Sequence, residues 1–159
     1  MKVKITVKTP PNQAARCINS QKDALIGFKK QKDVKEQKIV NDHEFYWILE
    51  VKDEKELGKV THRLAMGEVL IKKFYRTLFK VIRRANTLSK KFKKGSQWLK
   101  KQIIKRLDKV SMDNQDIKAQ IDSMNDEEFQ GWLEITDKEV MQELLSGPLF
   151  EVEVQENGI

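Results

Sequence analysis

The sequence predicts an α+β fold, in which a mainly antiparallel sheet of four to five strands packs on one long heptad-patterned helix plus shorter helices. Apolar and polar residues alternate near both ends of the chain, in residues 2–8 and 149–155, as in half-buried strands. Two more β-rich runs flank a short turn at residues 41–43. A 3-4 repeat of apolar residues from Leu57 to Phe92 predicts one long helix. Strands grouped around a block of helices are typical of the α+β class.

The first strand and the first helix are expected within the first 31 residues. Every second position of residues 2–8 is apolar, with Val3, Ile5 and Val7 on one side of the strand. Two prolines at positions 10 and 11 end this strand, and proline suits the start of a helix. That helix is expected over residues 12–31. Its inward-facing residues are expected to be Ala15, Ile18, Leu25 and Phe28.

A β-hairpin is expected next, with strands at residues 34–40 and 44–52. The turn between them is Asn41-Asp42-His43, whose residue types tolerate turn conformations. One side of the second strand is wholly apolar and consists of Phe45, Trp47, Leu49 and Val51. The other side mixes Tyr46, Ile48 and Glu50. We therefore expect a central strand with both faces partly covered.

The long helix is expected to begin after Asp53, which can cap it, with Glu56 three residues later as in a capping box. Only Gly67 interrupts its apolar seam. A glycine inside a helix costs about 1 kcal/mol relative to alanine, so Gly67 indicates a kink or the close approach of another backbone. The seam consists of Leu57, Val60, Leu64, Ile71, Phe74, Leu78, Val81, Ala85, Leu88 and Phe92.

The apolar stripe of this helix is wider than the seam of a two-stranded coiled coil. The additional apolar residues are Leu70, Tyr75, Phe79 and Ile82. We therefore expect the helix to pack within its own chain, which would be a monomer, and to end between Asn86 and Gly95. A helix-mediated homodimer is the alternative.

Two shorter helices are expected after the long one. Ser96 can cap a helix over residues 97–110, whose apolar side consists of Trp98, Leu99, Ile103, Leu107 and Val110. Asp113 can cap another over residues 114–124. The inward residues of that helix are expected to be Ile117 and Ile121.

The segment after residue 125 has two interpretations. Residues 129–135 share a pattern with the strand that precedes Asp53, which predicts a strand leading into a helix. The competing interpretation is a helical turn over 126–133 that is capped by Asn125. Beyond it, a short helix is expected over residues 138–145, ended by Gly147-Pro148, before the strand at 149–155.

The opening order of strand, helix, two strands and helix resembles that of a ferredoxin-like sheet. The first strand exposes lysines and the last strand exposes glutamates. Opposite charges on facing strands contribute roughly 0.2–1 kcal/mol per pair. We therefore expect the first and last strands to be neighbours in the sheet.

Length and composition are those of one α+β domain over residues 1–159. Charged residues make up 35% of the chain and apolar residues 39%, which suits a soluble protein. No apolar run approaches the roughly 18–20 residues of a membrane span. The lone Cys17 fits a reducing compartment, so a cytoplasmic location is expected. The lysine-rich composition also suits a phage or mobile-element protein.

Charge is strongly segregated along the chain. Residues 72–110 hold 15 lysines and arginines against one acid, a net charge of +14. Residues 111–159 hold two lysines against 13 acids, a net charge of −11. The chain therefore divides into a basic helical block at 54–110 and an acidic C-terminal part at 111–159. Such segregation indicates a polyanion-binding face, an internal pairing of basic and acidic parts, or both.

Nucleic acid, either DNA or RNA, is the partner that the basic block favours, because lysines and arginines on a helix can follow a phosphate backbone. Helix faces that merely contact solvent usually carry both signs of charge, and this one does not. The expected contact residues are cations of the basic block: Lys72, Lys73, Arg76, Lys80, Arg83, Arg84, Lys90, Lys91, Lys94, Lys101 and Lys105. Aromatic residues lie among them and could stack on bases, but their positions on or near the apolar seam favour core packing, with Tyr75 and Trp98 the better candidates for partial exposure.

The alternative function is that of a regulator or assembly factor, which docks its basic helices on an acidic protein partner. The acidic C-terminal part could also cover the basic face. No catalytic function is expected, because His43, His62 and Cys17 form no recognisable motif and no phosphate-binding loop is present. We expect neither a metal site nor a cofactor.

Overall fold

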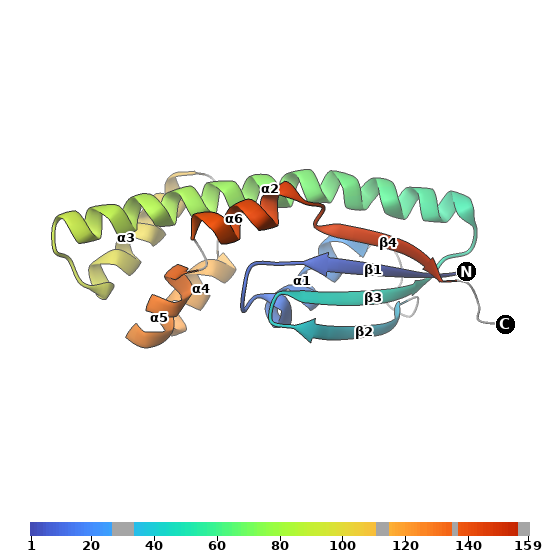
Figure 1. The fold of residues 1–159 in the computed structure, drawn as a ribbon, viewed down its shortest axis with the longest axis horizontal. Coiled ribbons are helices and arrows are strands. Elements are labelled where there is room, and N and C mark those ends of the chain that lie inside the picture. The colour runs from blue at the N-terminus through green and yellow to red at the C-terminus, as the bar shows by residue number, and fades with distance from the viewer. Residues whose placement is uncertain (27–33, 111–114, 135–136, 156–159) are drawn as a thin grey trace. The chain divides into compact units, whose positions relative to one another are not determined.

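A computed structural model of the protein describes residues 1–26, 34–110, 115–134 and 137–155. Within these residues it confirms the α+β class, with four antiparallel strands in one sheet and a long helix among six (Figure 1). The elements are β1 (Lys2–Lys8), α1 (Ala14–Ile26), β2 (Val34–Asn41), β3 (Glu44–Glu50), α2 (Glu54–Lys91), α3 (Ser96–Lys109), α4 (Gln115–Ser123), α5 (Asp126–Leu133), α6 (Lys138–Ser146) and β4 (Phe150–Gln155).

The chain forms two compact units, and helix α2 contributes to both. The first unit consists of Met1–Lys72 and Gln142–Ile159, and it contains the sheet. The second unit, Lys73–Met141, is helical. The assignment of residues 1–159 to one domain stays a prediction.

The sheet of the first unit has the strand order β2-β3-β1-β4, and every neighbouring pair is antiparallel (Figure 1). Strands β1 and β2 therefore run parallel, with β3 between them. This is the strand order of a ferredoxin-like sheet. In place of a single second helix, helices α2–α6 separate β3 from β4 in the sequence.

The expected pairing of the first and last strands is confirmed. In the β1–β4 register, Lys4 lies opposite Glu153 and Thr6 lies opposite Glu151. Lys4 and Glu153 thus form a directly opposed pair of unlike charge, which is the favourable arrangement of cross-strand charges. The chain's last described strand is thereby joined to its first.

The core of the first unit lies between one face of the sheet, α1 and the first half of α2. Its sheet residues are Val3, Ile5, Val7, Phe45, Trp47 and Leu49, all at most 1% exposed. The indole Nε1 of Trp47 donates a hydrogen bond of 3.1 Å to the carbonyl oxygen of Ile18 on α1, which ties helix to sheet. On α1, Ile18 and Leu25 face inward as expected, but Ala14 is buried in place of Ala15. The expected inward position of Phe28 lies outside the described residues.

The opposite face of the sheet carries charged and polar side chains around Tyr46. The ammonium group of Lys4 lies 4.5 Å from the centre of the Tyr46 ring, and the Tyr46 hydroxyl donates a 3.2 Å hydrogen bond to Glu36. Partial desolvation raises the pKa of Tyr46, and the nearby negative charge of Glu36 raises it further. As expected, β3 is a central strand with both faces partly covered.

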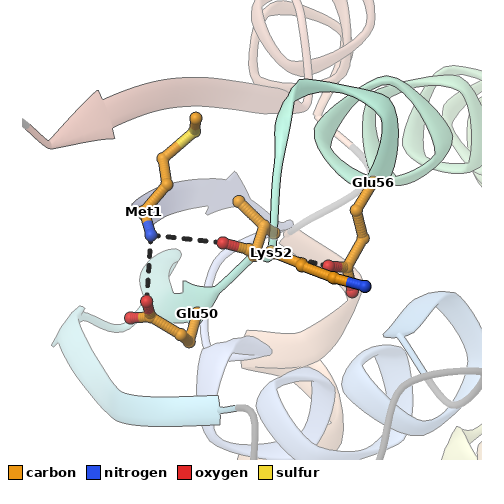
Figure 2. A network of polar contacts seen from close by, with 5 residues as sticks. Met1, Glu50, Lys52 and Glu56 are labelled. Atoms are coloured by element: carbon orange, nitrogen blue, oxygen red, sulfur yellow. Dashed lines mark hydrogen bonds and ion pairs between the residues drawn. The ribbon is translucent and has the colours of Figure 1, made fainter.

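Polar contacts fix the start of α2 (Figure 2). Asp53 caps the helix, because its Oδ1 accepts a 2.9 Å hydrogen bond from the backbone N–H of Glu56. The Glu56 carboxylate returns to the N–H of Lys52 at 2.5 Å, one residue before the cap, so the capping box is displaced by one residue. Beside it, the amino group of Met1 donates to the Glu50 carboxylate at 2.9 Å and to the Val51 carbonyl at 3.2 Å.

Gly67 marks the place where α1 approaches α2. A β-carbon at Gly67 would lie 2.3 Å from Cδ2 of Leu25. The approaching group is thus a side chain rather than the expected backbone. The absence of a side chain at Gly67 lets Leu25, which is 7% exposed, pack directly on the helix.

In the second unit, the latter part of α2 packs on α3, α4 and α5. The buried residues of this core are Leu78, Ile82, Ala85, Leu99, Ile103, Leu107, Ile121, Phe129, Trp132 and Leu133. The seam of α2 is buried or half-buried from Leu57 to Leu88. It ends there, because α2 stops at Lys91 and Phe92 is 57% exposed. Leu70, expected to widen the buried stripe, is 68% exposed instead.

Several expectations for the shorter helices need correction. Gly95, not Ser96, is the N-cap of α3, and Val110 at its other end is exposed. The strand expected at residues 129–135 is wrong. Helix α5 occupies the segment as far as Leu133, and the Asn125 side chain accepts a 2.8 Å hydrogen bond from the N–H of Glu128. The expected cap at Asp113 lies outside the described residues.

Candidate nucleic-acid interface

The outward face of α2 in the second unit carries a row of exposed cations. Arg76, Lys80 and Arg83 follow one another at steps of four and three residues, and Lys90 lies seven residues further on. Such spacing places side chains on one face of a helix. The buried residues Leu78, Ile82 and Ala85 occupy the inner face. Burial of the apolar face therefore holds the cations toward solvent, as the sequence pattern predicts.

These cations line an open hollow of about 400 Å³, which we call the cationic hollow. Its described lining residues are Arg76, Lys80, Arg83, Arg84, Thr87 and Met141. None of them is acidic. Four like charges around one concavity generate a positive potential that attracts an anion. Guanidinium groups, which form a planar fork of donors, are well suited to phosphate oxygens.

A second hollow of about 810 Å³ adjoins the first, and Arg83 and Thr87 line both. We call it the mixed hollow, because amides, carboxylates and cations line it together. Its described lining residues are Arg83, Asn86, Thr87, Lys90, Gln130, Leu133, Glu134, Asp137 and Lys138. Helix α2 thus contributes one wall, while α5 and the start of α6 contribute the other.

Hydrogen bonds fix several of the polar groups in the mixed hollow. Asp137 caps α6, since its Oδ1 accepts a 2.8 Å hydrogen bond from the N–H of Glu139. The Gln130 amide nitrogen donates to the Ser96 hydroxyl at 3.2 Å, and the Thr87 hydroxyl donates to the Arg83 carbonyl at 2.9 Å. Contacts at the start of α6 and at the start of α3 therefore hold Asp137 and Gln130 in place.

The structure places the other expected contact residues outside the two hollows. Five are exposed and line neither hollow: Lys73, Lys91, Lys94, Lys101 and Lys105. Lys72 is half-buried and belongs to the first unit. The sequence pattern missed the uncharged and acidic lining residues of both hollows: Asn86, Thr87, Gln130, Leu133, Glu134, Asp137 and Met141.

Two charged residues of the basic block contribute to the packing of the second unit. Lys100 is 7% exposed, and its ammonium group donates a 2.5 Å hydrogen bond to the carbonyl of Met124. The same group lies 5.3 Å from the centre of the Phe129 ring. Asp108, the lone acid of residues 72–110, forms an ion pair with Lys118 on α4. This ion pair leaves the cations of the two hollows untouched.

The aromatic residues near the cations are mostly part of the packing. Tyr75 is 5% exposed and stacks on Phe79 at 5.9 Å between ring centres, so its expected partial exposure is wrong. Trp98 is half-buried, as expected. Stacking on a base through Tyr75 therefore has no support from this structure.

The remaining candidates for chemistry are scattered. His43 lies on the β2–β3 turn with its Nδ1 2.6 Å from Oδ1 of Asp42, and His62 is exposed on α2. Within residues 1–26, 34–110, 115–134 and 137–155, no three histidine, cysteine or acidic side chains are grouped as a metal site would require. Among the helices of the same residues, none combines the length and the apolar composition needed to cross a bilayer.

Comparison with known proteins supplies no relative from which a function could be transferred. No protein-family model, no curated protein and no solved structure matches this chain.

Proposed function

We propose that this is a non-enzymatic nucleic-acid-binding protein that grips a phosphate backbone with the outward face of α2. The observation that carries the proposal is the cationic hollow. Four exposed cations surround it, and none of its described lining residues is an acid. A helix held rigid by a buried inner face can present such a row of cations without rearrangement.

The salt dependence of binding follows from this geometry. Each phosphate that a cation neutralises releases condensed counterions, and the logarithm of affinity falls by about 0.9 per contact for each tenfold rise in salt on duplex DNA. If the four cations of the hollow contact phosphates, they supply a slope of about −3 to −4. The other exposed cations of α2 and α3 would steepen it.

Reversal of three charges tests the proposal. In the variant Arg76→Glu, Lys80→Glu and Arg83→Glu, we expect affinity for DNA and RNA to fall at least about 100-fold. Fluorescence anisotropy across a salt series measures the affinity and the slope. The matched control replaces Lys52, Lys55 and Lys59 by glutamate, which removes the same charge at exposed positions near the start of α2. Circular dichroism establishes that both variants fold.

Two results would contradict the proposal. One is the absence of binding to any DNA or RNA at low salt, and the other is equal loss of affinity in both triple variants. Stoichiometric binding of an acidic protein partner, resistant to nuclease and abolished by the same α2 variant, would establish the alternative function. The two functions are separated because a folded partner and an oligonucleotide can be assayed independently.

A further inference from the structure

The mixed hollow differs in chemistry from the cationic hollow that it adjoins. Glu134 and Asp137 place two carboxylates in it beside the cations Arg83, Lys90 and Lys138, so its lining mixes both signs of charge instead of offering the single sign that favours a phosphate. Yet Arg83 and Thr87 line both hollows, so a ligand phosphate near Arg83 lies at the entrance of the mixed one. The part of a nucleic acid that enters the mixed hollow would therefore meet amides and carboxylates as well as cations, which suits a nucleobase, with its hydrogen-bond donors and acceptors, better than a second phosphate.

The polar groups of the mixed hollow are those that recognise base edges. A carboxylate only accepts hydrogen bonds, and the exocyclic amino group of cytosine or adenine is a donor. The amides of Asn86 and Gln130 offer donors and acceptors. Thymine and uracil lack an exocyclic amino group. A volume of about 810 Å³ lies within the range of small-ligand sites, roughly 300–1,000 Å³.

We propose that the mixed hollow takes one unpaired nucleobase of a single strand, with preference for a base that carries an amino group, while the adjoining phosphate lies in the cationic hollow. This inference rests on the proposed function. A base inside a duplex presents its pairing edge to its partner, so only an unpaired base can turn into the hollow. The protein is therefore a single-strand binder, with the phosphate read by Arg83 and its neighbours and the base read by Asp137 and Glu134.

Asp137 offers a conservative test because its two roles can be separated. Its Oδ1 caps α6 through the N–H of Glu139. Asparagine caps a helix about as well as aspartate does, so Asp137→Asn keeps the cap and removes the charge. An amide can also donate to the O4 atom of thymine. The substitution should therefore relax the preference for an amino-bearing base without unfolding α6.

The experiment compares three labelled probes at one salt concentration. They are a thymidine dodecamer, the same dodecamer with one central cytidine, and a duplex of equal length. We expect the cytidine probe to bind about tenfold tighter than the thymidine probe and more tightly than the duplex. In Asp137→Asn/Glu134→Gln the preference for cytidine should fall to about twofold, with the salt slope unchanged. In Arg76→Glu/Lys80→Glu the salt slope should fall and the preference should remain.

The matched control is Asp126→Asn/Glu127→Gln, which removes the same charge from the first turn of α5 at exposed positions outside both hollows. It should keep the preference of the unmodified protein. If Asp137→Asn/Glu134→Gln tightens binding to all three probes equally, or if the unmodified protein binds duplex and single strand alike, the base site is overturned while the proposed function stands. If cytidine monophosphate competes as well as the dodecamer, the ligand is a nucleotide and the single-strand inference fails. If no probe binds, both proposals fail.

Discussion

Lys100 is a buried cation whose ammonium group makes its contacts inside the second unit. Its ammonium group bonds the Met124 carbonyl and lies over the Phe129 ring, which connects α3 to the α4–α5 junction. Lys100→Met keeps the length of the side chain but leaves that carbonyl without its donor. We expect a loss of about 1–2 kcal/mol in the free energy of unfolding, measured by urea denaturation. Lys101→Met, at an exposed neighbouring position, should change it by less than about 0.5 kcal/mol. Equal effects at both positions would contradict the structural role of Lys100.

Glu50 gives the first unit a pH-dependent contribution. The hydrogen bond from the Met1 amino group lowers the pKa of this carboxyl below its ordinary value of 4.5, while desolvation opposes the shift. Because the pKa is lower in the folded protein, the charged form stabilises the fold above pH 4.5. That contribution is lost as the pH falls through the folded-state pKa. Glu50→Gln should therefore be less stable than the unmodified protein near neutral pH, and the difference should shrink in acid. Thermal unfolding from pH 3 to pH 7 measures it, and a pH-independent difference would refute the coupling.

At the scale of elements, two glycines of α2 differ in the space that surrounds them. Gly58 has no atom within 4 Å of an added β-carbon, whereas the β-carbon at Gly67 would meet Leu25 at 2.3 Å. Gly58→Ala should raise the free energy of unfolding by about 0.5–1 kcal/mol through helix propensity. Gly67→Ala gains the same propensity but must displace a buried side chain, which typically costs about 1–3 kcal/mol. We expect it to be destabilising by about 1 kcal/mol, measured by denaturant titration.

A double-mutant cycle isolates the cause. In the background Leu25→Ala the obstructing side chain is gone, so Gly67→Ala should there be stabilising, as Gly58→Ala is. If Gly67→Ala remains equally harmful without the Leu25 side chain, close packing of α1 on α2 is not the reason for the glycine.

The end of α2 contains a strained residue. Lys93 has φ of +53°, a left-handed conformation that costs an L-residue roughly 1–2 kcal/mol. The N–H of Lys94 bonds the Ser89 carbonyl at 2.8 Å, and the N–H of Lys93 bonds that of Lys90 at 3.4 Å, as in a Schellman cap. Lys93→Gly should therefore raise the free energy of unfolding by about 1 kcal/mol. Lys94→Gly, at a position without positive φ, should bring no gain in the same titration.

Helix α5 is an element whose type the local sequence pattern could not decide. Phe129 and Leu133 suit a strand in residue type, and the match to the segment before Asp53 favours that interpretation. In the structure Phe129, Trp132 and Leu133 lie at helical spacing and are buried, and Asn125 caps the helix that carries them. The cap signal was present in the sequence, but eight residues are too few for periodicity to decide between the two. Over the 38 residues of α2, by contrast, periodicity predicted the helix, its buried seam and its cationic outer face, although Leu70 is exposed against expectation.

At the scale of the molecule, the exposed cations were predictable and the hollows were not. Helical spacing alone places Arg76, Lys80 and Arg83 opposite the buried seam. The walls supplied by Gln130, Glu134 and Asp137 depend on how α5 and α6 pack beside α2, which no local pattern contains. The same holds for the acidic part of the chain. Its net charge suggests a cover for the basic face. Among the acids that the structure describes, only Glu134 and Asp137 line the hollows, while Glu153 lies opposite Lys4 and Glu151 opposite Thr6 on β1.

An edge strand of the sheet, β4, comes from the far end of the sequence. Truncation of the chain at that end should therefore destabilise β1, its neighbour in the sheet. Strand β4 pairs with β1 along Lys2–Val7, and the Lys8 N–H bonds the carbonyl of Leu149, a residue that is 1% exposed. A chain that ends after Ser146 loses these bonds and exposes one edge of β1. We expect hydrogen exchange, followed by mass spectrometry, to show lost amide protection in β1. Protection should persist in α3 and α5, whose core contains no residue of β4. A chain that ends after Gln155 should keep the exchange pattern of the full chain.

If β1 keeps its protection without β4, the pairing of first and last strands is not what holds this edge of the sheet. If α3 loses protection together with β1, the two units unfold as one.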